Sequence, residues 1–245
     1  MSLTHWFNTP LGQFVKQAET TLLTVHLQNL FGYHLLLIGA GNTEWLETSR
    51  IPHRLFVPVD KDLPIDSNGQ QNESLIQADA AYLPIATDSV DTVILQHALD
   101  FSGNPHQVLR EAERVLMPGG RILVCGFNAR SLWGLSRVMH FKQAHVPWNG
   151  KFQSTSRLKD WLSLLGFEME FQQKVFFRPP FKSENLLNKL EFMERVCAKI
   201  LPFSGGIYLL VAKKKVSNLI PIKPRWQARR NKVSGWVDTA PRSKD

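Results

Sequence analysis

The stretch LLLIGAGNTEW, residues 35–45, joins an apolar run to a turn that contains two glycines. Glycine has no Cβ, so Gly39 and Gly41 would let the backbone come close to a bound ligand. Carboxylates follow two later apolar runs, at Asp60 and Asp79. A carboxylate accepts hydrogen bonds from the hydroxyl or amino groups of a ligand. The spacing therefore suggests a small-molecule site, although a two-glycine turn on its own is usually only a turn.

The elements that must position these residues alternate along the chain. Apolar runs at residues 35–38, 90–95 and 122–127 have the length and composition of strands buried inside a parallel sheet. Apolar residues follow helical spacing through residues 10–30 and again through residues 105–116. Strands and helices that alternate at these lengths form right-handed βαβ units. The sequence therefore predicts an α/β fold with helices on both faces of a parallel sheet.

Four further segments lead to more specific expectations. Residues 55–59 contain an internal proline, Pro58, which predicts an edge or irregular strand. Residues 75–78 predict a short strand, and the apolar residues between 186 and 200 predict one helix. Residues 176–181 and that helix form an insertion between the last two strands. The insertion either covers an apolar substrate as a lid or packs on the sheet, and we favour packing.

The length and composition indicate one α/β core with at most a small appendage. The chain has 245 residues, 43% of them hydrophobic, and no apolar run approaches the ~18 residues that span a membrane. Its first residues lack the basic start and apolar stretch of a secretory signal. Cys125 and Cys197 lie far apart in apolar contexts, which favours reduced thiols over a disulfide or a metal site. We therefore expect a cytoplasmic protein with no transmembrane segment and no metal.

The net charge of +8 is concentrated at the C-terminal end. Residues 213–245 hold ten Lys and Arg against two Asp, and the rest of the chain is neutral. Trp226 and Trp236 lie among these cations, a combination that binds RNA phosphates and bases or an anionic membrane surface. A disordered, solubilising tail is the simplest interpretation. RNA binding is an alternative that would run through this tail.

Residues 75–127 carry the features that identify a family. They include QADAAYLPIATDSVDTVILQHAL and then LREAERVLMPGGRILVCGF. These segments resemble the class I S-adenosylmethionine (SAM)-dependent methyltransferases of the type-11 branch. The usual form of that branch has an acid and a small residue, a Leu-Pro pair, a Ser-Phe-Asp turn and then R-V-L-x-P-G-G. The opening WFNTPLGQF and FGYHLLLIG are similar to a bacterial subgroup that is mostly uncharacterised. The resemblance covers most of residues 33–212.

The resemblance implies a Rossmann-like, doubly wound sheet of seven strands, mostly parallel with an antiparallel last strand. SAM would bind at the carboxyl ends of the strands. The resemblance also divides the chain into an N-terminal helical segment (1–32), a methyltransferase domain (33–215) and a basic, disordered tail (216–245).

The same resemblance implies roles for individual residues in holding SAM. Asp60 would accept hydrogen bonds from the ribose hydroxyls, and Asp79 would receive the exocyclic amine of adenine. Ala80 would offer its backbone N–H to the adenine ring, and Gln96 would lie near the methyl donor. The expected cofactor-binding set is therefore Gly39, Gly41, Asp60, Asp79, Ala80 and Gln96.

Two residues depart from the usual form of the family. An acid is common at position 37 and a third glycine at position 43, where this chain has Leu37 and Thr43. The missing acid removes one partner for the methionine end of SAM. A nicotinamide-binding Rossmann domain is the competing interpretation. Its G-x-G-x-x-G pattern requires glycine at position 44, and Glu44 would repel a pyrophosphate there.

Methyl transfer is an in-line displacement, so positioning supplies much of the catalysis. An oxygen or nitrogen nucleophile also needs a base within hydrogen-bond reach. His97 is the first candidate for this base and Asp100 the second, although a lone histidine at a strand end is more often structural. We expect a SAM-dependent methyltransferase that acts on a small molecule. The alternative is a catalytically degenerate relative that binds a ligand, or binds RNA through its tail.

Overall fold

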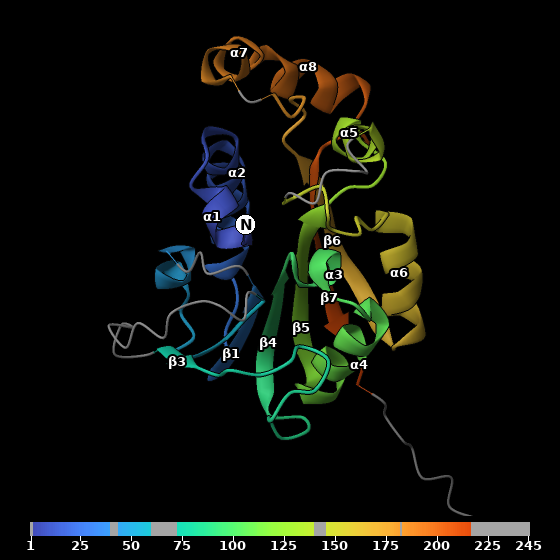
Figure 1. Ribbon diagram of the computed structural model, residues 1–245. Coiled ribbons are helices and arrows are strands. Elements are labelled where there is room, and N and C mark those ends of the chain that lie inside the picture. Colours follow the sequence, from blue (N-terminus) through green and yellow to red (C-terminus); the bar gives the residue numbers. More distant parts are fainter. Residues whose placement is uncertain (1, 40–43, 60–72, 140–145, 182, 217–245) are drawn as a thin grey trace, which may run out of the picture.

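The computed structural model describes residues 2–39, 44–59, 73–139, 146–181 and 183–216 (Figure 1). The predictions for Gly41, Asp60 and the basic tail therefore lie outside the described residues. Within the described ranges, no helix is long and apolar enough to cross a membrane.

Seven strands form one sheet in the order β3-β2-β1-β4-β5-β7-β6. Strands β1 to β5 pair in parallel, whereas β7 is antiparallel to both of its neighbours. The predicted sheet, mostly parallel with an antiparallel last strand, is therefore confirmed. The strands are β1 (His34–Gly39), β2 (His53–Pro58), β3 (Glu73–Leu75), β4 (Val90–Gln96), β5 (Leu116–Phe127), β6 (Phe167–Val175) and β7 (Ile207–Lys214).

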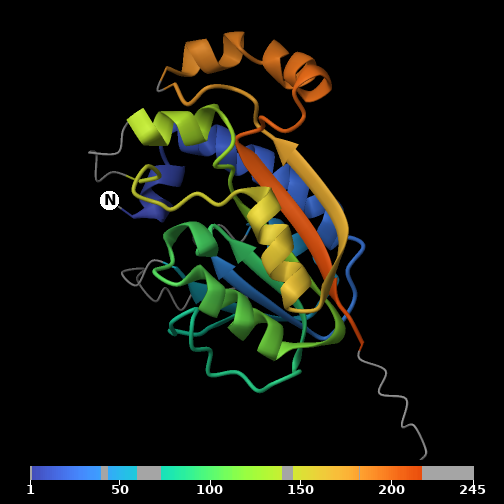
Figure 2. The same ribbon diagram turned by 90° about the vertical axis from the view of Figure 1, so that its right-hand side faces the viewer.

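Helices cover both faces of the sheet and one end of it. In Figure 1, α1 and α2 lie on one side and α4 and α6 on the other, while α7 and α8 lie beyond the strand ends. Figure 2 shows α4 and α6 in front of the sheet with α2 behind it. The helices are α1 (Leu3–Phe7), α2 (Pro10–Leu27), the 3-10 helix η1 (Glu44–Thr48), α3 (Ala98–Phe101), α4 (Pro105–Val115), α5 (Leu132–Met139), α6 (Thr155–Leu164), α7 (Glu184–Lys189) and α8 (Phe192–Ile200).

The hydrophobic core has two layers, one on each face of the sheet. Side chains alternate between the faces of a strand, so Leu35 and Leu37 of β1 pack with α1 and α2, whereas Leu36 and Ile38 pack with α4. All four side chains are fully buried. A strand covered on both faces has no exposed position for a polar residue, which explains its unbroken apolar run.

Local signals define the first long helix. Thr9 is the N-cap of α2 and its hydroxyl accepts from the backbone N–H of Gly12 at 3.2 Å, while Pro10 occupies the first turn. The buried side of α2 contains apolar residues and one charged residue, Glu19, which is also fully buried. A carboxylate on this side is not explained by the amphipathic pattern.

Two strand predictions need correction. An edge or irregular strand is predicted at residues 55–59, and the edge position is wrong, because β2 lies between β1 and β3 and pairs with both. Pro58 is the last residue of β2, so its missing N–H interrupts no ladder further along the strand. The short strand predicted at residues 75–78 occurs earlier, as β3 at Glu73–Leu75.

The insertion between β6 and β7 differs from the single helix predicted between residues 186 and 200. It contains two helices, α7 and α8, separated at Leu190 and Glu191. Its first residues pack on the body of the protein, as expected: Phe176 is buried, and the indole N–H of Trp133 donates to the carbonyl of Arg178 at 3.0 Å. Apolar residues of α8 remain exposed, including Phe192.

Candidate cofactor-binding site

The strand order reverses between β1 and β4, and two predicted site residues meet there. Gly39 ends β1 and Gln96 ends β4, in adjacent parallel strands. A Cβ added at Gly39 would lie 3.0 Å from Gln96 Cβ and 3.2 Å from Gln96 Oε1. Glycine at position 39 therefore permits this close approach. A reversal of this kind is where open α/β sheets bind their ligands.

Gln96 is fully buried and has one unpaired polar atom. Its Nε2 donates to Glu19 Oε2 at 2.9 Å. An ionised carboxylate only accepts hydrogen bonds, so Glu19 fixes the direction of the Gln96 amide. Gln96 Oε1 is left with no hydrogen-bond partner among the described residues. A buried acceptor without a partner at a sheet reversal fits a site that receives a hydrogen-bond donor.

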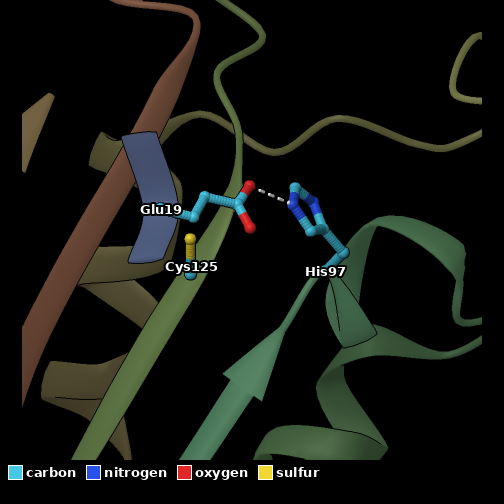
Figure 3. A group of neighbouring side chains, drawn as sticks. All are labelled: Glu19, His97 and Cys125. Atoms are coloured by element: carbon cyan, nitrogen blue, oxygen red, sulfur yellow. Dashed lines mark hydrogen bonds and ion pairs between the residues drawn. The ribbon is translucent and has the colours of Figure 1, made fainter. Parts of the chain in front are cut away.

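His97 lies between two carboxylates. It follows β4 in the left-handed conformation, with φ 55°, and its side chain is fully buried. Its Nε2 lies 2.6 Å from Glu19 Oε1 (Figure 3), and its Nδ1 lies 3.0 Å from Asp100 Oδ2. Asp100 Oδ2 also accepts from the backbone N–H of Phe127 at 2.9 Å. Glu19, Gln96, His97 and Asp100 thus form one buried cluster, called here the Glu19 cluster.

Two members of the Glu19 cluster, His97 and Asp100, have raised pKa values. Burial alone would lower the pKa of His97, but the charge of Glu19 and the hydrogen bonds with Asp100 and Glu19 raise it to about 10. His97 is therefore an imidazolium at neutral pH. Burial raises the pKa of the Asp100 carboxyl, against the lowering by its hydrogen bond to His97. The imidazolium of His97 therefore lies between Glu19 and a carboxyl group whose burial favours its protonated, neutral form.

Cys125 of β5 adds a thiol beside the cluster (Figure 3). One ligand atom each from Glu19, His97 and Cys125 lie within 4.8 Å of one another, and these residue types bind transition metals. Burial, and then the charges of Glu19 and Asp100, raise the pKa of the Cys125 thiol well above its ordinary value. A metal would therefore have to remove the thiol proton and open the contact between Glu19 and His97. The observed arrangement is a hydrogen-bonded cluster.

The adenine side of the expected site lies in the loop after β3. Asp79 is exposed, and its Oδ1 accepts from the backbone N–H of Ala81 at 2.9 Å. Ala80 beside it is half-buried. The structure therefore brings Gly39, Gln96, His97 and Asp100 together, while Asp79 and Ala80 lie in a separate turn. Their contacts with adenine stay a prediction.

Glu19 is the residue of this site that the sequence interpretation missed. Its contacts with Gln96 and His97 join residues 77 and 78 positions apart in the chain. The available signal was its place in the helix: Glu19 follows Val15 by four residues and precedes Leu22 by three, which puts it on the apolar side. A charge on that side of a helix requires a partner inside the fold.

A cavity of about 600 Å³ is lined by residues of α1, α2 and α7, and no residue of the Glu19 cluster lines it. Phe7, Asn8, Phe14 and Glu184 are among its lining residues. The Phe7 ring also lies 5.9 Å from the His97 ring, centroid to centroid. One aromatic side chain therefore borders both the cavity and the cluster.

Comparison with known proteins establishes the family. A family model described as "Methyltransferase domain", type 11, matches residues 53–124. The uncharacterised protein YafS of Escherichia coli (strain K12) is 30% identical over 211 residues, which are 86% of this chain and 80% of YafS. The chain belongs to the class I SAM-dependent methyltransferases, in the type-11 branch. The uncharacterised bacterial subgroup expected from the sequence agrees with the match to YafS.

Solved structures share the fold of this methyltransferase family member. The [4+2]-cyclase SpnF has a TM-score of 0.58 at 20% identity, over 82% of each chain. A SAM-dependent methyltransferase from Archaeoglobus fulgidus has a TM-score of 0.56 at 20% identity, over 80% of this chain and 94% of its own. These likenesses show the Rossmann-like architecture of the sheet and its flanking helices.

Proposed function

We propose that the protein binds SAM and transfers its methyl group to a small molecule. The observation that carries this proposal is the buried, unpaired Oε1 of Gln96, adjacent to Gly39 where β1 and β4 meet. SAM has a cationic sulfonium and an ammonium group in its methionine part, and both favour acceptor oxygens over donors. Membership in the methyltransferase family supports the same cofactor.

The residues present fit the two ends of SAM differently. Gly39 and Gln96 would hold the methionine end. Gly39 has no Cβ to keep the ligand away from the backbone, and Gln96 Oε1 is an acceptor without a partner among the described residues. Asp79 and Ala80 would hold adenine, as the family resemblance implies. When bound, SAM supplies an electrophilic methyl group. The protein would bind and orient the reactants and exclude water, which supplies much of the rate enhancement for a displacement.

The sequence made His97 and Asp100 candidates for a catalytic base, and that role stays a prediction. The arrangement supports a different one, because His97 is fully buried and protonated and has no lone pair to accept a proton. We therefore propose that both residues position the end of β4.

Calorimetric titration with SAM and S-adenosylhomocysteine tests the proposal. The parent protein should bind both ligands at micromolar concentrations, and Asp79→Ala should weaken both. Asp160→Ala, an exposed carboxylate of α6, is the matched control and should bind as the parent does. Absence of binding by the parent at millimolar ligand would overturn the proposal.

A second candidate is a ligand-binding or RNA-binding protein that does not transfer methyl groups. SpnF, which has this fold, is a [4+2]-cyclase, so the fold accommodates reactions other than methylation. The missing acid at Leu37 and the ten basic residues of positions 213–245 favour this alternative. Retention on RNA that falls with salt and disappears after truncation behind Val216 would support it.

A further inference from the structure

We infer that Glu19 is a positioning residue of the cofactor site, which orients Gln96 and carries the negative charge opposite the cationic part of SAM. The inference rests on the proposed function, since it concerns how the methionine end of the cofactor is held. It assigns a role to α2, which precedes the sheet in sequence and lies outside residues 75–127, the segment that resembles the family.

The burial of Glu19 is not explained by the packing of α2. Its side chain is fully buried in a helix whose neighbouring inward residues are Val15, Leu22 and Leu23. Moving an unpaired carboxylate into an apolar interior is strongly unfavourable, and pairing recovers only part of that cost. Leucine would serve the contact between α2 and the sheet. The reason for a carboxylate at position 19 must therefore lie in its contacts with Gln96 and His97.

Glu19 occupies the face of the sheet on which the usual acid of the family is missing. Leu37 of β1 and Cys125 of β5 both belong to the core layer beneath α1 and α2. Glu19 extends from α2 toward this same layer, with a carboxylate oxygen within 4.8 Å of Cys125 Sγ. A carboxylate from the covering helix thus reaches the face where Leu37 offers none.

Glu19 also determines which atom Gln96 presents. Glu19 Oε2 accepts from Gln96 Nε2 at 2.9 Å, so the amide oxygen faces Gly39. Replacing the carboxylate by an amide would remove this constraint, because an amide can both donate and accept. Gln96 could then turn its NH₂ group toward Gly39. A donor at that position would oppose a cationic ligand, whereas the present acceptor favours one.

The acceptor oxygens of the cluster complement a cation. Glu19 and Asp100 face a single imidazolium, His97, and Asp100 Oδ1 has no hydrogen-bond partner within the part of the chain that the structure describes. Charges in a buried site are weakly screened, so the oxygens of Glu19, Gln96 and Asp100 favour a cationic ligand over a neutral ligand of the same shape.

SAM and S-adenosylhomocysteine differ in this respect and therefore test the inference. SAM has a sulfonium, whereas S-adenosylhomocysteine has a neutral sulfur. We would titrate the parent, Glu19→Gln, Glu19→Asp and Glu168→Gln with both ligands by calorimetry. Glu168→Gln makes the same chemical change at an exposed position of β6 and is the matched control.

Glu19→Gln should reduce the affinity for SAM on the order of tenfold more than the affinity for S-adenosylhomocysteine, as expected for loss of a charge near a cation. Glu19→Asp should retain part of the preference for SAM, and the control should retain all of it. An unchanged ratio of the two affinities in Glu19→Gln would overturn the inference while leaving cofactor binding intact. If the parent binds neither ligand, the proposed function itself fails and the inference fails with it.

A second readout does not depend on any ligand. The imidazole of His97 should titrate near pH 10 in the parent and at lower pH in Glu19→Gln, as followed by NMR. Titration at the same pH in both proteins would show that Glu19 does not set the charge of the cluster and would overturn the inference. Zinc that co-purifies with the parent and is lost in Glu19→Gln would also overturn it, because Glu19 would then be a metal ligand.

Discussion

Replacing Glu19 by glutamine should change how the stability of the protein depends on pH, because Glu19 holds a proton on His97. The pKa of His97 is about 10 in the folded protein and 6.5 is its ordinary value. A group whose pKa is raised by folding stabilises the fold fully below its unfolded pKa. That contribution disappears as the pH rises through the folded pKa.

The size of the effect follows from this difference. Between pH 6.5 and about pH 10 the folded state holds one proton more than the unfolded state at this residue. The free energy of unfolding should then fall by about 1.4 kcal/mol per pH unit, and by about 5 kcal/mol over the whole window as an upper bound. Without the Glu19 charge the folded pKa of His97 moves back toward its ordinary value. The slope should become clearly smaller.

The assay is urea unfolding at about pH 7, 8 and 9, followed by tryptophan fluorescence. Measurements stop near pH 9 because burial also raises the pKa values of Cys125 and Tyr208 well above their ordinary values. Above that pH, these two groups would also lower the free energy of unfolding, in the same direction as His97. Glu168→Gln should keep the slope of the parent. An equal slope in the parent and in Glu19→Gln would refute the assignment of the His97 charge to Glu19.

Three further predictions follow from the same site. Gly39→Ala should weaken the binding of SAM and S-adenosylhomocysteine about tenfold in calorimetry, because the added Cβ would lie 3.0 Å from Gln96 Cβ. Gly103→Ala is the control and should bind both ligands as the parent does, because a Cβ added there meets open space. Tyr208→Phe should leave the free energy of unfolding in urea unchanged or raise it by about 1 kcal/mol, because the Tyr208 hydroxyl is buried without a hydrogen-bond partner among the described residues; a loss above that size would contradict this. Dialysis against EDTA should leave the affinity for SAM unchanged, because His97 Nε2 contacts Glu19 directly, and a loss restored by zinc would show a metal instead.

The parts of the fold that the sequence predicted are those with local signals. The alternation of strands and helices and the apolar run of β1 depend on neighbouring residues. So does the helical spacing of residues 10–30, which corresponds to α2. The position of Pro58 was misjudged because a proline within an apolar run gives no information on which strands lie beside it. Pro58 is the last residue of β2, a position where its missing N–H is tolerated.

The candidate site was only half predictable for the same reason. Gln96, His97 and Asp100 were found because they follow a recognisable strand. The charge that does most to keep His97 protonated comes from Glu19, in a helix more than seventy residues earlier. Spacing within a motif carries no information about such a contact. The break between α7 and α8 was missed because their apolar residues keep helical spacing across it.

The contact between α2 and the end of β4 has a consequence for how the protein can be divided. The family model spans residues 53–124 and the expected domain starts at residue 33, so an expression fragment designed from either boundary would omit Glu19. A fragment that starts at residue 33 would retain the sheet reversal between β1 and β4, and one that starts at residue 53 would also lose β1. Both fragments would leave Gln96 and His97 without the Glu19 carboxylate. With the role inferred for Glu19, the binding unit extends over the N-terminal helices. Searches for functional relatives should include position 19 as well as the glycine turn.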